Sequence, residues 1–121
     1  MIKVICQLRD INIAMNDLEI QLNDKYGVGL NEAMALCCLS EGRLSASEIA
    51  EMTGMTSSHC SKVIRSVEQK MLIERSLGEN DKRQMYFNLN KEGKKVLSQI
   101  KCKGLVLPEI LQPVLGHCDE E

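Results

Sequence analysis

The chain has 121 residues, a formal net charge of -2 and 44% hydrophobic residues, which suits a single folded domain with an apolar core. Only 2% of the residues are aromatic, which argues against a protein that stacks RNA or single-stranded DNA bases on exposed rings. Basic residues outnumber acidic ones between Arg43 and Lys103, whereas both ends are acidic. This asymmetry indicates either an anionic partner for the middle of the chain or an ordinary solvated surface.

The start of the chain lacks the pattern of a signal peptide, because Lys3, Gln7 and Arg9 interrupt its apolar residues. No apolar run approaches the ~20 residues that a membrane-spanning helix needs. We therefore expect a cytoplasmic protein without a membrane partner. Six cysteines without a C-x-x-C pair favour free thiols, and we expect neither a metal nor a cofactor.

The first predicted element is a long helix over residues 3–24. Its apolar residues recur at alternating steps of four and three, which produces one continuous seam along the helix. A second subunit could cover this seam, and packing within the chain is the alternative. The seam consists of Val4, Leu8, Ile11, Met15, Leu18 and Leu22.

Two shorter helices are expected next. The nearly continuous apolar run at 33–39 predicts a buried central helix. Either Ser45 or Ser47 can cap a helix over 46–53, with Ile49, Ala50 and Met52 on its inner face. Gly54 follows this helix, where a tight turn would use its freedom at positive φ.

A fourth helix is expected from residue 57 to about residue 70, capped by Thr56 or Ser57. One of its faces is apolar, and the other is polar, small at its start and basic further on. Two short strands follow at 72–77 and 84–89, joined by a polar turn. A helix capped by Asn90 then follows, and a last short helix opens at Pro108.

This order of elements predicts a mainly α fold, a winged helix-turn-helix with a small two- to three-stranded antiparallel wing. Such a helix fits the major groove of duplex DNA, where its first side chains reach base edges. The hairpin tip can reach a flanking groove, and further arginines can contact phosphates. The candidate DNA-binding residues are Thr56, Ser57, Ser58, His59, Ser61, Lys62 and Arg65 on the helix, Lys82 and Arg83 at the tip, and Arg43 and Arg75 elsewhere.

At this point the sequence resembles the MarR family of transcription regulators over about residues 4–115. In the wing, Asp81-Lys82-Arg83 matches the family's Asp-x-Arg step. The segment Leu89-Asn90-Lys91-Glu92-Gly93 matches its Leu-Thr-x-x-Gly entry to the next helix, with Asn90 as an equivalent cap. The segments that carry the resemblance are 44–55, 60–68, 71–75, 80–83 and 87–93.

The resemblance implies a homodimer formed by a single domain over residues 1–121. Helices within 1–25 and 104–118 would dimerise, and residues 30–103 would form the winged helix-turn-helix lobe. Asp81 would orient Arg83 and brace the wing, and Arg83 would enter a minor groove. The family further implies a repressor that a small molecule releases by binding between the dimer helices and the lobe.

Two other functions remain open. The overall acidity and modest wing charge suit a winged helix that binds another protein instead of DNA. Some MarR-like regulators sense peroxides through a cysteine early in the first helix, which makes Cys6 a candidate thiol switch. The sequence contains no nucleophile–base pattern and no glycine-rich phosphate loop, so we do not expect an enzyme.

Overall fold

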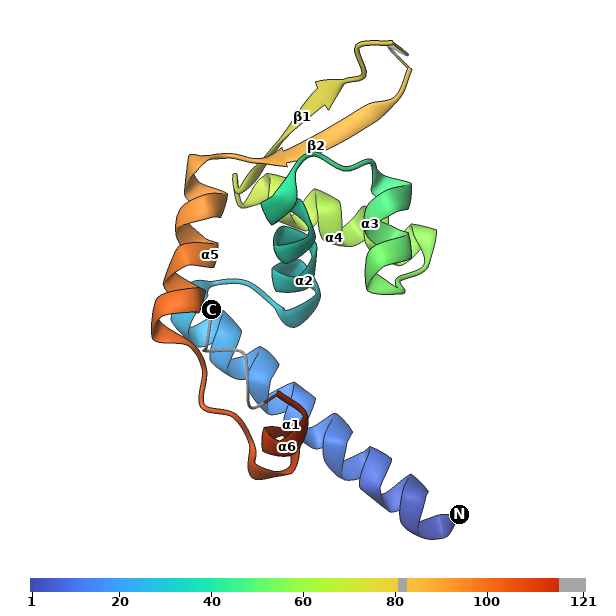
Figure 1. Cartoon of the computed structure of the whole chain (residues 1–121), viewed down its shortest axis with the longest axis vertical. Coiled ribbons are helices and arrows are strands. Elements are labelled where there is room, and N and C mark those ends of the chain that lie inside the picture. Colours follow the sequence, from blue (N-terminus) through green and yellow to red (C-terminus); the bar gives the residue numbers. More distant parts are fainter. Residues whose placement is uncertain (81–82, 116–121) are drawn as a thin grey trace. The chain divides into compact units, whose positions relative to one another are not determined.

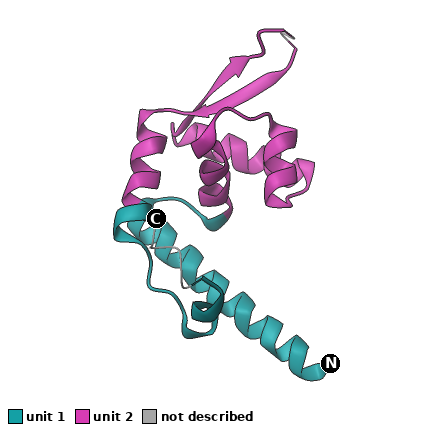
Figure 2. Ribbon diagram, viewed as in Figure 1, with its two compact units in different colours: residues 1–30, 100–121 teal, residues 31–99 magenta. Residues whose placement is uncertain are grey.

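A computed structural model describes residues 1–80 and 83–115 of the chain (Figure 1). The chain forms two compact units, one made of Met1–Leu30 with the chain from Ile100 onward, the other of Asn31–Gln99 (Figure 2). Helices dominate both, and a two-stranded antiparallel sheet lies in the second. The expected mainly α fold with a small wing is therefore confirmed. Asp81 and Lys82, together with the end of the range 104–118, lie outside the described residues.

Helix α1 (Ile2–Tyr26) provides the framework of the first unit and ends at Gly27, which adopts the left-handed conformation at φ 73°. The chain after residue 103 packs against this helix through a 3₁₀ turn, η2 (Glu109–Leu111), and helix α6 (Gln112–Leu115). Gln21 fixes that segment by donating to the carbonyl of Val106 at 2.7 Å and accepting from its N–H at 2.8 Å. The core contains Ala14, Leu18 and Leu111, flanked by Ile11, Leu105, Leu107 and Leu115.

This packing divides the predicted apolar seam of α1. Leu18 and Leu22 are only 7% and 3% exposed, so they serve the core of their own chain and offer no surface to a second subunit. Val4, Leu8 and Met15 are 47%, 57% and 42% exposed. The single-chain packing therefore leaves mainly the N-terminal part of the seam uncovered.

The second unit begins with α2 (Leu30–Cys38), continued by the 3₁₀ turn η1 (Leu39–Glu41), then α3 (Ala46–Thr53) and α4 (Ser57–Gln69). Ser45 caps α3 in a reciprocal capping box, since its Oγ accepts from the N–H of Glu48 while Glu48 Oε1 accepts from the N–H of Ser45. Thr56 caps α4 by accepting from the N–H of His59 at 3.2 Å. Of the two pairs of candidate caps, Ser45 rather than Ser47 caps α3, and Thr56 rather than Ser57 caps α4.

The hairpin consists of β1 (Ile73–Leu77) and β2 (Met85–Leu89), paired antiparallel with Ile73 opposite Leu89. Leu44 adds a single bridge to Phe87, with backbone bonds of 3.1 and 2.8 Å in the two directions. The bridge ties the segment before α3 to the wing, so the sheet has two strands and one bridging residue.

Helix α5 (Lys91–Lys103) follows the hairpin and is capped by Asn90, whose Oδ1 accepts from the N–H of Gly93 at 2.8 Å. Glycine is required at residue 93 because a Cβ there would overlap the carbonyl oxygen of Leu72. The same carbonyl accepts the N–H of Asn90 at 3.2 Å, so α5 begins pressed against the start of β1.

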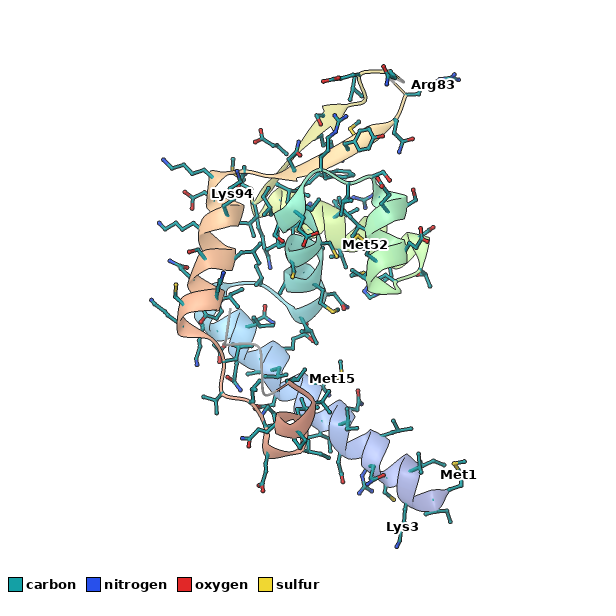
Figure 3. All side chains as sticks on the ribbon, viewed as in Figure 1. Met1, Lys3, Met15, Met52, Arg83 and Lys94 are labelled. Carbon is teal, nitrogen blue, oxygen red and sulfur yellow. The ribbon has the colours of Figure 1, made fainter. Side chains whose placement is uncertain are left out.

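Met52 was expected on the inner face of α3, and this prediction is wrong, because its side chain is 59% exposed (Figure 3). Ile49, expected on the same face, is fully buried, and Thr53, one helical turn later, bonds the Ile49 carbonyl through its Oγ1 at 2.8 Å. In a helix of eight residues the inner face is narrow. The apolar character of Met52 was therefore not enough to show that it shares the inner face of α3 with Ile49.

Candidate nucleic-acid interface

Helix α4 presents the polar face that the sequence predicted. Cys60, Val63, Ile64 and Val67 are buried and attach the helix to the core of its unit. The other side of the helix is exposed. Its side chains are small near the N-terminus of the helix and basic in the middle. The exposed candidates are Ser57, Ser58, His59, Ser61, Lys62 and Arg65.

A concavity of about 410 Å³ joins this face to the wing. Ser57 and Ser61 of α4 lie on one side of it, and Arg83 with Gln84 lies on the side of the hairpin. Figure 3 shows Arg83 projecting from the tip of the hairpin. Helix and wing candidates thus share one surface, which the first turn of α3 completes with Ser45, Ala46 and Ser47.

Six residues of this concavity were not among the predicted candidates, and of these Ser47 and Gln84 are the polar residues that are not buried. Ser47 Oγ lies 3.2 Å from Ser45 Oγ and is exposed, so its hydroxyl is available at the rim. The sequence drew attention to Ser47 only as a possible cap of α3. In the structure Ser45 is the cap, so the Ser47 hydroxyl is not used for capping. Gln84 precedes β2 and no local pattern distinguishes it.

Arg43 does not line this concavity. Its guanidinium carbon is 4.4 Å from the centre of the Tyr86 ring, a cation–π contact. A second hollow of about 270 Å³ surrounds the pair, lined also by Gly78, Glu79, Asn80 and Gln84. A phosphate contact by Arg43 stays a prediction.

Arg75 connects the wing to α4. Its Nη2 donates to Glu68 Oε1 at 2.8 Å, its Nε donates to Glu68 Oε2, and its guanidinium lies 5.8 Å from the Phe87 ring centre. The hydrogen bond from Arg75 lowers the pKa of the Glu68 carboxyl, with smaller contributions from the charges of Arg75 and Arg65. Glu68 in turn raises the pKa of Arg75. Arg75 therefore fixes β1 to α4, and its predicted phosphate contact stays untested.

His59 is held at the start of α4. Its Nε2 lies 3.3 Å from Nδ2 of Asn31 in the first turn of α2, at hydrogen-bond distance. The ring is exposed, so it can still reach a partner of α4. Its role in DNA binding stays a prediction.

The basic excess in the middle of the chain lies mostly on α5. Residues 43–90 contain seven basic and six acidic side chains, whereas α5 contains five lysines and one glutamate. The helix-turn-helix and wing are therefore nearly neutral. Attraction of these elements for a polyanion must come from the local placement of Lys62, Arg65 and Arg83.

The described cysteines are free thiols. Cys6, the candidate sensor, is half-buried on α1. Burial raises the pKa of Cys60 and of Cys38, so these thiols are less reactive than exposed ones.

Over residues 1–80 and 83–115, no group of three or more His, Cys, Asp or Glu side chains is arranged to hold a metal ion. In the same ranges, no helix has the length and apolar character to cross a membrane.

Comparison with protein families identifies the winged-helix part of the chain. The model of the MarR family matches residues 30–85, from the start of α2 to the start of β2. This segment of the chain is similar to the MarR family. The resemblance seen in the sequence is thereby confirmed.

Several solved structures share the fold of this chain. The transcriptional regulator BldR from Sulfolobus solfataricus matches 95% of this chain and 81% of its own, at 18% identity and a TM-score of 0.76. The MepR–DNA complex of S. aureus matches 90% and 80%, at 22% identity and 0.72. A MepR-like protein complexed with pseudoligands matches 97% and 81%, at 19% identity and 0.77. A search of curated protein sequences gives no significant match.

Proposed function

We propose that this protein is a transcription regulator that binds duplex DNA through α4 and the β1–β2 wing. The observation that carries the proposal is the concavity in which Ser57 and Ser61 of α4 lie together with Arg83 of the wing, beside the exposed Lys62 and Arg65 on the same helix. The similarity to the MarR family and the fold shared with MepR, solved in complex with DNA, support it.

Helix α4 acts as the recognition helix. Ser57, Ser58 and Ser61 are small enough for its first turns to approach the floor of a major groove, and their hydroxyls can bond to bases or phosphates. Lys62 and Arg65 follow on the same face, within reach of phosphates or guanine edges. Arg83 enters an adjacent minor groove from the wing, where the negative potential of a narrow groove attracts arginine.

The regulator acts as a homodimer. Its first helix exposes large apolar side chains along the part that its own C-terminal segment leaves uncovered, including Ile5, Leu8 and Ile13 at 59%, 57% and 60%. Several large apolar side chains exposed on one helix favour a protein–protein contact there. Two copies would place two recognition helices on half-sites about one helical turn apart on a near-palindrome.

Repression of a cytoplasmic promoter is the regulatory sense that we propose, because a dimer seated on a promoter excludes other proteins from it. Relief by a small molecule is the further step that the family resemblance implies. The described residues do not identify that molecule, and the effector stays a prediction.

A duplex titration tests the DNA-binding proposal. The promoter beside the protein's own coding region is titrated at two salt concentrations with wild type, Arg65→Ala, Arg83→Ala and the control Lys95→Ala on α5. We expect wild-type affinity to fall steeply with salt, and the two arginine variants to bind about tenfold or more weakly. The control variant should bind nearly as wild type does.

One observation favours a second candidate function, a module that binds another protein. The charge of the helix-turn-helix and wing is nearly balanced, which is unusual for a DNA-binding surface. A folded wild type that binds no duplex even at low salt, or arginine variants that bind as wild type does, would favour this second candidate.

A further inference from the structure

A buried carboxylate lies behind the recognition helix. Glu32, in the first turn of α2, is only 9% exposed. Its Oε2 accepts a hydrogen bond from Ser66 Oγ at 2.5 Å, and its Oε1 accepts from Lys70 Nζ at 2.6 Å. Ser66 lies near the C-terminal end of α4, and Lys70 is the residue that caps that end. The cluster therefore joins α2 to α4 through directional, charge-assisted contacts.

The same turn of α2 contacts the other end of α4. Asn31, next to Glu32, lies at hydrogen-bond distance from His59, which is two residues from the start of α4. One turn of α2 thus contacts α4 near both of its ends.

The stability of the fold alone does not explain why a carboxylate is buried at residue 32. Burial of the Glu32 carboxylate costs free energy, and its attraction to Lys70, whose side chain is 37% exposed, returns only part of that cost. Replacing such a pair by apolar side chains of similar size is often neutral or stabilising. The remaining buried contacts of α4 come from Cys60, Val63, Ile64 and Val67, and they provide the apolar packing of the helix.

Apolar packing does not fix the rotation of a helix as well as hydrogen bonds do, because the hydrophobic effect has no direction. A rotation of roughly 20° about the axis of a helix ~10 Å in diameter moves the ends of its side chains by about 2 Å. That displacement is enough to break a hydrogen bond to a base edge.

We propose that Glu32 is a positioning residue that sets the rotation and axial register of the recognition helix through Ser66 and Lys70. The proposal rests on the proposed function, since the benefit of a fixed helix is the correct placement of Ser57, Ser61 and Arg65 on DNA. Glu32 acts on that surface through its contacts with Ser66 and Lys70, toward the other end of α4.

The first test replaces the cluster by apolar side chains, as Glu32→Leu/Ser66→Ala/Lys70→Met. The thermal midpoint and the affinity for the promoter duplex are measured together. We expect the midpoint to equal or exceed that of wild type, while DNA affinity falls about tenfold. A stable triple variant that binds DNA as wild type does overturns the proposal.

The second test uses Glu32→Gln, which keeps an acceptor for Ser66 and also covers the case in which the triple variant does not fold. Its matched control is Glu51→Gln, at an exposed position of α3. Removal of a negative charge should by itself tighten binding to DNA in both variants. We expect weaker binding for Glu32→Gln and slightly tighter binding for the control, so equal affinities of the two variants contradict the proposal.

A readout without DNA separates this inference from the proposed function. Backbone amide shifts of α4 are compared by NMR between wild type and Glu32→Gln. We expect shifts to extend from Ser66 back to residues 57–61, far along the helix from the substituted contact. Shifts confined to Ser66 and Lys70 would overturn the positioning role. Failure of wild type to bind any duplex would instead overturn the proposed function, and the amide shifts would still decide the role of Glu32.

Discussion

The close approach of α5 to β1 predicts a large effect of the substitution Gly93→Ala. A Cβ at residue 93 would lie 3.1 Å from Leu89 Cδ2 and far inside contact distance of the Leu72 carbonyl oxygen. A carbon beside a carbonyl oxygen normally lies about 3.3 Å away, so the space is too short by roughly 1 Å. The obstacle is backbone, which cannot rotate away as a flexible side chain can.

Relief of the overlap requires α5 to move away from β1. Such a shift would also break the bond from the Asn90 N–H to the Leu72 carbonyl, which is 3.2 Å long. Overpacking usually costs ~1–3 kcal/mol, and the lost hydrogen bond places this variant at the upper end, about 3 kcal/mol. In a chain of this size that loss lowers the thermal midpoint by about 10 °C.

Urea unfolding of Gly93→Ala followed by circular dichroism measures this loss, with Gly27→Ala as the control. Gly27 also requires a special conformation, φ 73°, but its added Cβ would meet nothing within 4 Å. The control should therefore lose only about 1 kcal/mol, the cost of a left-handed backbone for alanine. If Gly93→Ala loses no more than Gly27→Ala, the steric explanation is refuted.

Three further predictions concern local strain, pH and thiol reactivity. Met71 has φ 61° and is 73% exposed, so Met71→Gly should raise the free energy of unfolding by about 1 kcal/mol; a loss in urea unfolding would contradict this. Arg75 lowers the folded-state pKa of Glu68, so this pair stabilises the fold above the unfolded pKa and loses its contribution as pH falls below about 4.5. Glu68→Gln should therefore lose less stability than wild type between pH 6 and about 3, and parallel losses would refute the linkage. Because burial raises the pKa of Cys60 and Cys37 is exposed, iodoacetamide should label Cys37 first by mass spectrometry, and equal rates would contradict the burial of Cys60.

Local patterns predicted most of the winged helix. The cap at Ser45 followed by Glu48, the glycine after α3 and the polar turn between two apolar runs are signals confined to a few neighbouring residues. These elements appear within one or two residues of their expected bounds. The amphipathic pattern of α4 likewise identified its exposed face correctly.

Contacts between distant residues were beyond the sequence patterns. Glu32 appears in the sequence only as an acidic residue in the first turn of a helix, and its partners lie 34 and 38 residues away. The pairing of Arg75 with Glu68 similarly depends on how β1 crosses α4. Periodicity also could not separate the two uses of the α1 seam, because packing within a chain and between chains needs the same apolar spacing.

Hydroxyl-radical footprinting of the promoter duplex tests the central claim, that α4 and the wing bind duplex DNA, most directly. The wild-type protein should protect two patches on each strand, about 10 base pairs apart, as expected for paired recognition helices. Arg65→Ala should weaken the protection in both patches at the same protein concentration. Uniform cleavage at low salt with folded wild-type protein, or protection unchanged in Arg65→Ala and Arg83→Ala, would contradict the claim.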